Sequence, residues 1–188
     1  MKIIFIFIFI FIFIFIQNFA NASTKSQIIN NFQNINNIKF YFIQKIHEKT
    51  ESGKCAIVYP KKIFCKYKDK YNKILVSNGK SLVINSDRNK QYYRYNLNKT
   101  PLNIILDKNL MIKKMKDLNN ENKFIDNYSF KFIYENNHVT IFFDKKNLNL
   151  KGWATTDIYQ NKVETLISNI EINSNIDEKI FNIQNYIN

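Results

Sequence analysis

The stretch K-I-L-V-S-N-G-K-S-L-V-I, residues 73–84, predicts a β-hairpin in the middle of the chain. Two apolar runs flank Asn78-Gly79, and this dipeptide suits a type I′ turn, which needs positive φ at both central residues. A turn centred there sets the cross-strand pairs, which are Ser77–Lys80, Leu75–Leu82 and Ile74–Val83. We therefore expect antiparallel strands on both sides of this turn.

The segment after the hairpin predicts a strand and then helical structure. Gln91–Tyr95 is rich in tyrosine, which favours strands. Thr100 can cap a helix and Pro101 suits the first helical position. The apolar face of this helix contains Leu102, Ile105 and Leu106. Helical spacing continues on a lysine-rich stretch whose apolar residues are Met111, Met115 and Leu118. This stretch fits either a solvated amphipathic helix or a surface that contacts a membrane.

The segment before the hairpin predicts one helix and three strands. Residues 24–38 place apolar side chains at helical spacing, behind a capping box at Thr24 and Gln27. Residues 38–46 then alternate as a strand does. Residues 51–53 predict the end of this strand. Two further strands are predicted at residues 54–59 and 63–67, joined by a turn at Pro60.

Residues 128–143 predict a second hairpin that turns at Asn136-Asn137. One face of this hairpin is apolar along both strands, as expected of a sheet packed on a core. The predicted pairs on that face are Phe130–Phe143, Phe132–Ile141 and Tyr134–Val139. A third hairpin is predicted from residues 148–157 and 162–170, followed by an edge strand at 181–187. Hairpin after hairpin predicts an α+β fold that is mainly antiparallel β, in a single domain over residues 23–188.

Residues 1–22 have the pattern of a secretory signal peptide. Lys2 precedes an unbroken Ile/Phe run over residues 3–16, and Ala20-Asn21-Ala22 forms an A-x-A cleavage site. An uncleaved N-terminal anchor is the alternative. No cysteine stands near the cleavage site, so no lipobox is present and we expect a soluble, exported protein.

The composition favours a packed protein and limits its partners. Hydrophobic residues make up 45% and aromatic residues 15%, which is enough for a large core. The formal net charge of +13 indicates anionic partners or a compositional bias toward lysine. Export argues against nucleic acid as a partner, and nothing in the sequence requires more than a monomer.

The sequence predicts no catalytic site. His47 and His138 are the two histidines, and neither has further ligands at metal-binding spacing. Motifs for nucleotide binding or hydrolysis are missing, so we expect no enzyme activity, no cofactor and no metal. Cys55 and Cys65 stand nearly opposite each other and point to the same face, so a disulfide bridge and two thiols both stay open.

Apolar side chains are in surplus, and they serve either a filled core or a cavity for acyl chains. A sixteen-carbon chain exposed to water costs roughly 12 kcal/mol, at about 0.8 kcal/mol per methylene, so a carrier with a covered cavity would be needed to move it. The candidate lipid-binding residues are Phe40, Phe42, Leu102, Ile105, Leu106, Phe130, Phe132, Ile141 and Phe143. Among these, Leu102, Ile105 and Leu106 are the candidates for a movable lid.

The order of these parts resembles the periplasmic outer-membrane lipoprotein carrier family (LolA). The resemblance covers nearly the whole chain after residue 23, and each motif is weak alone. The matching pieces are the helix from Ser26 to Ile38, Phe40-x-Phe42-x-Gln44, Ile74–Leu82, Thr100-Pro101-Leu102, Leu150–Asp157 with its Gly152, and Phe181.

The resemblance implies an unclosed antiparallel barrel whose helices cover a hydrophobic cavity. It also implies a periplasmic chaperone of a Gram-negative bacterium that takes acylated lipoproteins from an inner-membrane ABC exporter to an outer-membrane receptor. A lipid or lipoprotein sensor and a receptor-like protein of the same fold remain alternatives. Members usually carry Arg where this chain has Tyr59, and that Arg is associated with lid closure and onward transfer, so the handover step is the part in doubt.

Overall fold

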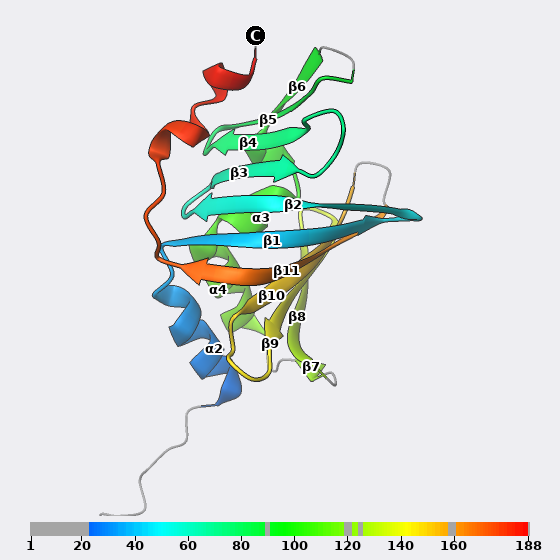
Figure 1. The fold of residues 1–188 in the computed structure, drawn as a ribbon. Helices are drawn as coiled ribbons and strands as arrows, with labels where there is room; N and C mark the ends of the chain where they lie inside the picture. Colours follow the sequence, from blue (N-terminus) through cyan, green and yellow to red (C-terminus); the bar gives the residue numbers. More distant parts are fainter. Residues whose placement is uncertain (1–22, 89–90, 119–121, 124–125, 158–160, 188) are drawn as a thin grey trace, which may run out of the picture.

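One curved, unclosed sheet contains all the strands that the structure describes (Figure 1). The computed structural model describes residues 23–88, 91–118, 122–123, 126–157 and 161–187. The predicted signal peptide therefore lies outside the described residues. The sheet has 11 strands, every neighbouring pair is antiparallel, and the order is β6-β5-β4-β3-β2-β1-β11-β10-β9-β8-β7. The predicted fold class, mainly antiparallel β with an unclosed sheet, is confirmed.

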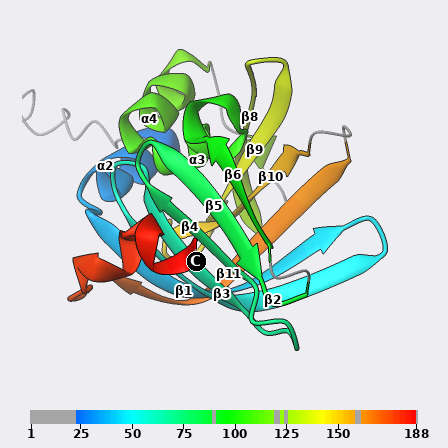
Figure 2. The same cartoon turned by 90° about the horizontal axis from the view of Figure 1, so that it is seen from above.

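The strands in chain order are β1 (Asn37–Ile46), β2 (Lys49–Val58), β3 (Lys62–Tyr67), β4 (Ile74–Asn78), β5 (Ser81–Ser86), β6 (Gln91–Asn96), β7 (Asn122–Lys123), β8 (Asn127–Tyr134), β9 (Asn137–Asp144), β10 (Leu150–Thr156) and β11 (Lys162–Ile172). The helices are α2 (Thr24–Gln33), α3 (Leu102–Leu106) and α4 (Lys108–Asp117), and the 3₁₀ turns are η1 (Leu97–Lys99), η2 (Glu178–Phe181) and η3 (Ile183–Tyr186). Figure 2 shows the sheet curling partly around the three α-helices, which lie on its concave side.

The register predicted for the hairpin β4–β5 is wrong by two residues. The observed pairs are Ser77–Leu82, Val76–Val83, Leu75–Ile84 and Ile74–Asn85. Within this hairpin, only Gly79 has a positive φ, 97°, so the turn is centred on Gly79 and Lys80, with Gly at the first central position. The Asn78 side-chain oxygen accepts from the backbone N–H groups of Lys80 and Ser81, both at 3.0 Å, and this holds Asn78 in the strand.

The register predicted for β8–β9 is wrong in the same way. Glu135 and Asn136 have positive φ and form the turn, in place of Asn136-Asn137. The observed pairs are Tyr128–Phe143, Phe130–Ile141, Phe132–Val139 and Tyr134–Asn137. A shift of two residues keeps every side chain on its face because the strand period is two, so the predicted apolar face survives.

The break predicted at residues 51–53 is also wrong, because β2 runs through it. Gly53 pairs with Phe42 on β1 and with Tyr67 on β3. A Cβ at residue 53 would stand 2.3 Å from the carbonyl oxygen of Lys66 and 2.8 Å from the Phe42 ring. Gly53 therefore marks a close approach of strands inside the sheet, which a sequence pattern cannot distinguish from a chain break.

The helices are shorter than predicted. α2 ends at Gln33, and a separate strand, β1, begins at Asn37. The helical region after Thr100 consists of two helices, because Asp107 leaves helical geometry and its side chain caps Leu110 at the start of α4.

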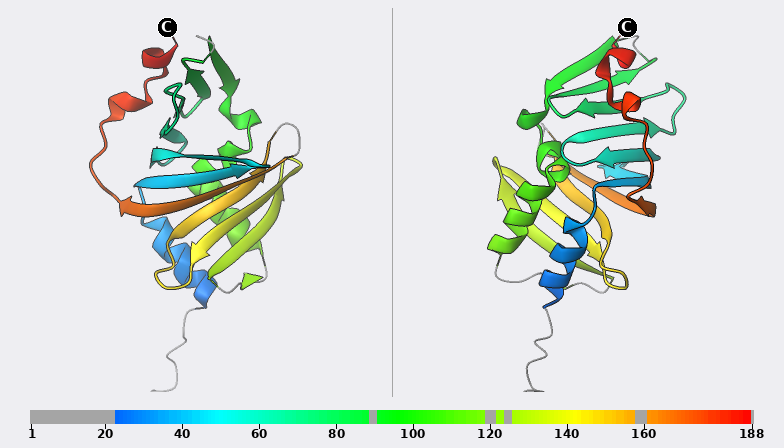
Figure 3. Two further views of the ribbon diagram at one scale, coloured as in Figure 1. Left: turned by 45° about the vertical axis from the view of Figure 1, so that its right-hand side comes forward. Right: turned by 90° about the vertical axis from the view of Figure 1, so that its left-hand side faces the viewer.

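The edge strand predicted at residues 181–187 does not form. Asp177 and Asn182 each accept from a backbone N–H two residues ahead and start the turns η2 and η3. Ile183 is 3% exposed and packs with Val76 and Val83 on the convex side of the sheet. Figure 3 shows this C-terminal segment, in red, crossing the side of the sheet opposite to α2 and α4.

A continuous hydrophobic core fills the space between the concave side of the sheet and the helices. Met111 and Met115 on α4 are both fully buried there, so this face of the lysine-rich helix packs on the protein itself. Within the part of the chain that the structure describes, no helix has the length and apolar character needed to cross a membrane.

Candidate functional site

The candidate site is the apolar interior on the concave side of the sheet. Side chains from β1, β8 and β9 point into it because every second residue of a strand faces the same side. The predicted residues Phe40, Phe42, Phe130, Ile141 and Phe143 are at most 3% exposed in this interior. Phe132 is partly buried against the same cluster.

Aromatic side chains form the densest part of the interior. Phe143 makes edge-to-face contacts with Phe130 on β8 and with Phe32 on α2, at ring-centroid distances of 5.7 and 5.8 Å. Phe40 contacts Trp153 of β10 in the same geometry at 6.1 Å. Trp153 and Phe32 were not among the predicted site residues, although the helical spacing of α2 and the alternation of β10 both indicate an inward position. The interior therefore joins residues from the first and last thirds of the chain.

The short helix α3 covers one part of this interior. Ile105 and Leu106 are buried at 1% and 0% exposure, and Leu102 is partly buried against the same core. The structure thus brings the three predicted lid residues over the predicted strand residues. In this conformation their side chains pack in the hydrophobic core.

Three polar contacts join α3 and the next residue, Asp107, to the turn between β2 and β3 and to β8, and none was predicted. The backbone N–H of Lys61 donates to the carbonyl oxygen of Leu106 at 2.8 Å. The Asn103 amide donates to the Tyr134 hydroxyl at 2.9 Å, and the Lys61 ammonium lies 3.5 Å from the Asp107 carboxylate. Each contact joins residues far apart in sequence, so no local pattern points to it.

Tyr59, at the position where the resemblance implies Arg, lies between α2 and α4. A cis peptide bond joins it to Pro60. Its ring contacts Phe32 edge to face at 5.8 Å, and the Lys108 ammonium lies 5.9 Å from the ring centre. The Tyr59 hydroxyl is buried and has no hydrogen-bond partner among the described residues. Burial raises the pKa of this hydroxyl far above its ordinary value.

Lys108 fastens the start of α4 to the end of α2. Its ammonium donates to the carbonyl oxygens of Gln33 at 2.8 Å and Ile35 at 2.7 Å. Partial burial lowers the pKa of Lys108. The Gln33 carbonyl is one that the end of a helix leaves unpaired, and Ile35 follows two residues later. The two bonds tie α4 to the end of α2 independently of α3.

Cys55 and Cys65 form a disulfide bond in this structure. They are directly opposed on β2 and β3, and both are buried in the core, at 8% and 4% exposure. The described residues contain no group of three or more His, Cys, Asp and Glu side chains that could hold a metal ion. The site is thus built from apolar contacts, with a covalent link between two of its strands.

Comparisons with known proteins place this fold. The profile of the family described as outer membrane lipoprotein carrier protein LolA matches residues 33–184. A search of curated proteins found no match. Among solved structures, MucB is similar with a TM-score of 0.50 and 10% identity, over 85% of this chain and 62% of MucB.

Two further structures are similar at lower TM-scores. A LolA superfamily protein from Nitrosomonas europaea has a TM-score of 0.44 and 10% identity, over 85% of this chain and 98% of its own. A DUF1329 family protein from Desulfovibrio piger has a TM-score of 0.48 and 8% identity, over 87% of this chain and 96% of its own.

Proposed function

The chain belongs to the outer membrane lipoprotein carrier protein LolA family, and from this premise we propose that it binds lipoprotein acyl chains in its apolar interior and carries them between membranes. The family is a binding and carrier family, not an enzyme family. The proposal assigns the interior residues of β1, β8, β9 and α3 to acyl-chain contact. It also places the protein in the periplasm, after cleavage of the segment 1–22, as a single domain over residues 23–188.

One observation supports acyl binding above the others. A concave apolar surface built from strands is covered by α3, a helix of five residues that is held by a few polar contacts. So short a helix is unstable alone and depends on packing. If α3 moves, the surface beneath it is already shaped and apolar, and an acyl chain can replace the side chains of Ile105 and Leu106. We therefore propose that residues 102–106 form a movable lid.

The proposed partners follow from the same premise. They are acylated lipoproteins, an inner-membrane ABC lipoprotein exporter as donor and an outer-membrane lipoprotein receptor as acceptor. The cargo has to leave as well as bind, so the lid has to open at both membranes.

A second candidate function is a lipid or lipoprotein sensor of the same fold. Tyr59 favours it, because the Arg at this position is associated with onward transfer in the family that the chain resembles. A sensor retains its ligand and signals to a protein partner, whereas a carrier passes the ligand on. Crosslinking in cells distinguishes the two: a carrier crosslinks to subunits of the exporter and a sensor does not.

Acyl binding can be tested with the single tryptophan of the chain. Trp153 contacts Phe40 inside the interior, so a lipid with brominated acyl chains should quench its fluorescence when the chains enter. The same lipid without bromine should not. Quenching that is missing at saturating lipid would overturn the proposed function.

Two neighbouring residues of β8 provide a matched pair of variants. Phe132 faces the interior and Ile133 is 60% exposed on the other face. We expect Phe132→Asp to weaken acyl binding at least about tenfold, because a charge would have to be buried against the chain. Ile133→Asp should bind as the wild type does, and circular dichroism checks that both variants fold.

A further inference from the structure

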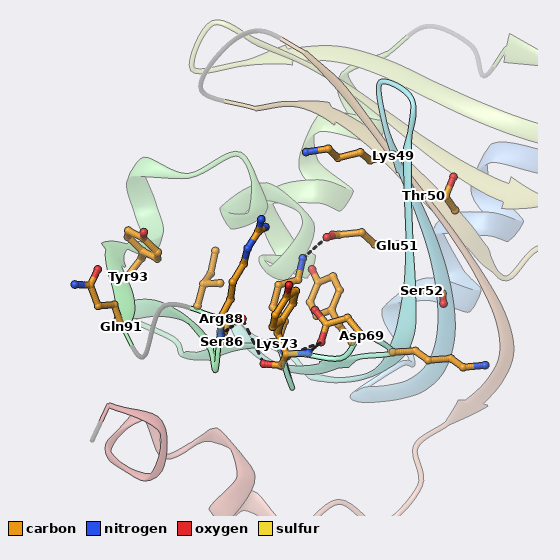
Figure 4. A pocket seen from close by; sticks show the side chains of 14 residues that line it. Lys49, Thr50, Glu51, Ser52, Asp69, Lys73, Ser86, Arg88, Gln91 and Tyr93 are labelled. Atoms are coloured by element: carbon orange, nitrogen blue, oxygen red, sulfur yellow. Dashed lines mark hydrogen bonds and ion pairs between the residues drawn. The ribbon is translucent and has the colours of Figure 1, made fainter.

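A pocket of about 570 Å³ lies on the concave side of the sheet, beside β2, β3, β5 and β6 (Figure 4). Its lining residues come from β2, β3, β5, β6 and the segments next to β4 and after β5, and none comes from α2, α3 or α4. The volume is within the range of about 300–1,000 Å³ that is usual for small-molecule sites. The apolar interior and this pocket are therefore two parts of one concave surface.

Cations outnumber acids in this pocket. The charged lining residues are Lys49, Lys68, Lys73 and Arg88 against Glu51 and Asp69, an excess of two positive charges (4 − 2). Both acids are already engaged. Glu51 pairs with Lys73 at 2.5 Å, and the Asp69 carboxylate accepts from the backbone N–H groups of Tyr71 and Lys73.

Three cations consequently remain without an acidic partner. Among the described residues, Lys49, Lys68 and Arg88 form no ion pair. Figure 4 shows the side chains of Lys49, on β2, and Arg88, in the turn after β5, reaching toward the same space. Guanidinium and ammonium groups arranged in this way suit a phosphate, which Arg binds through two parallel hydrogen bonds.

The side chain of Tyr67 lies between the pocket and the interior. Its ring contacts the Phe42 ring edge to face at 5.0 Å, and Phe42 belongs to the buried core. On the pocket side, the Lys73 ammonium lies 3.8 Å from the centre of the same ring. Tyr67 thus contacts both the apolar core and a cation of the pocket.

We propose that this pocket binds the phosphate group of an anionic amphiphile, held by Lys49 and Arg88, while its acyl chains enter the interior past Tyr67. The inference rests on the proposed function for the chains, and adds a headgroup site and a charge preference to it. An anionic phospholipid has both parts, whereas a zwitterionic lipid with the same chains gains less from the excess positive charge.

The test compares two brominated lipids with identical chains on the purified protein. Quenching of Trp153 is titrated with vesicles of brominated phosphatidylglycerol and of brominated phosphatidylcholine. The variant is Lys49→Glu/Arg88→Glu, and the matched control is Lys113→Glu/Lys146→Glu, which changes the net charge equally at exposed residues outside the pocket.

We expect the pocket variant to lose at least about tenfold in apparent affinity for phosphatidylglycerol, since a hydrogen bond to a charged group is worth more than a factor of ten. Its affinity for phosphatidylcholine should fall less, because the choline cation offsets part of the attraction between the phosphate and the pocket. The control variant should resemble the wild type with both lipids. Equal losses in the pocket and control variants would mean general charge attraction and would overturn the proposal.

Two further outcomes separate the possible failures. If both lipids quench Trp153 equally, in the wild type and in the pocket variant, the headgroup site is wrong and the acyl-binding function stands. If neither lipid quenches, the proposed function itself fails. Glycerol phosphate without chains serves as a competitor, and competition as strong as that of the whole lipid would assign the pocket to a soluble phosphate ester and overturn the lipid proposal.

Discussion

The side-chain amide of Asn103 donates a hydrogen bond to the hydroxyl of Tyr134, with 2.9 Å between the nitrogen and the oxygen. Asn103 lies on α3 and is 4% exposed, and Tyr134 is the last residue of β8. The bond therefore joins the proposed lid to the strand that provides Phe130 and Phe132 to the interior. Because Asn103 is buried, its amide has no access to water when this bond is lost.

Replacing Tyr134 by Phe should loosen α3 with little effect elsewhere. The variant leaves the buried Asn103 amide unpaired, which costs about 1–3 kcal/mol of unfolding free energy. Hydrogen exchange should become faster at residues 102–106 than in the wild type. Tyr92→Phe is the control, because Tyr92 is 44% exposed on the edge strand β6. Unchanged exchange at α3 in Tyr134→Phe would mean that packing alone holds the helix.

Replacing Tyr59 by Phe should increase the free energy of unfolding at pH 7 by about 1 kcal/mol. The Tyr59 hydroxyl is buried without a partner among the described residues, so the folded state loses its hydration and gains no hydrogen bond. Chemical denaturation of the two proteins measures the difference. A destabilised variant would mean that the hydroxyl has a partner in solution, such as a bound water.

Alkaline pH should destabilise the wild type through Tyr59 and Tyr67. Burial raises the pKa of both hydroxyls above the ordinary 10.0, so above that pH the folded state keeps protons that the unfolded state has lost. Stability is therefore present below pH 10 and falls as the pH rises, by up to about 1.4 kcal/mol per pH unit for each group. Tyr59→Phe and Tyr67→Phe should each reduce this slope, and the double variant should reduce it further. Parallel curves for all four proteins would contradict the prediction.

Removing the disulfide should lower the free energy of unfolding by about 2–3 kcal/mol, from the entropy of the short loop between Cys55 and Cys65. The variant Cys55→Ala/Cys65→Ala places no new polar group in the core. A reducing agent should shift the wild type toward the stability of this variant and leave the variant itself unaffected. A reductant that shifts both proteins equally would point to an effect unrelated to the bridge.

The faces of the strands could be predicted from the sequence, and their registers could not. The inward positions of Phe40, Phe130 and Phe143 follow from a period of two, which a register error of two residues does not disturb. The register depends on which residue takes positive φ, and the side chain of Asn78 settles this by bonding to the backbone after the turn. A dipeptide rule contains no information about that bond.

The contacts that hold the candidate site together could not be predicted from the sequence, for a different reason. Lys61 to Leu106 and Asn103 to Tyr134 each bridge elements that become neighbours only after the sheet has curved. In the sequence, Gly53 has the pattern of a residue that ends a strand. The structure shows that glycine is needed there because the Lys66 carbonyl of the next strand lies too close for a side chain. The alternation of apolar and polar residues along a strand predicts which side chains face the interior. The position of α3 over the interior depends on single polar contacts between residues far apart in sequence.

Acyl binding should release α3 and leave α4 in place. α3 has five residues and is fastened by single bonds at Lys61 and Tyr134, whereas α4 has ten residues and is tied to α2 through two bonds from Lys108. A bound chain that lies between α3 and the strands takes over the contacts of Ile105 and Leu106, so only the weaker helix has to move. Elements of this kind belong to the low-stability end of a structure.

Hydrogen exchange with and without saturating lipid measures this difference. We expect residues 102–106 to lose protection when lipid is bound, while residues 108–117 and the strands β2 and β3 keep theirs. The Asn103→Ala variant removes one fastening and should raise the rate of chain uptake, followed by Trp153 quenching, with the affinity changed less than the rate. Equal protection of both helices in the empty and loaded protein would mean that α3 is a fixed part of the core and does not act as a lid.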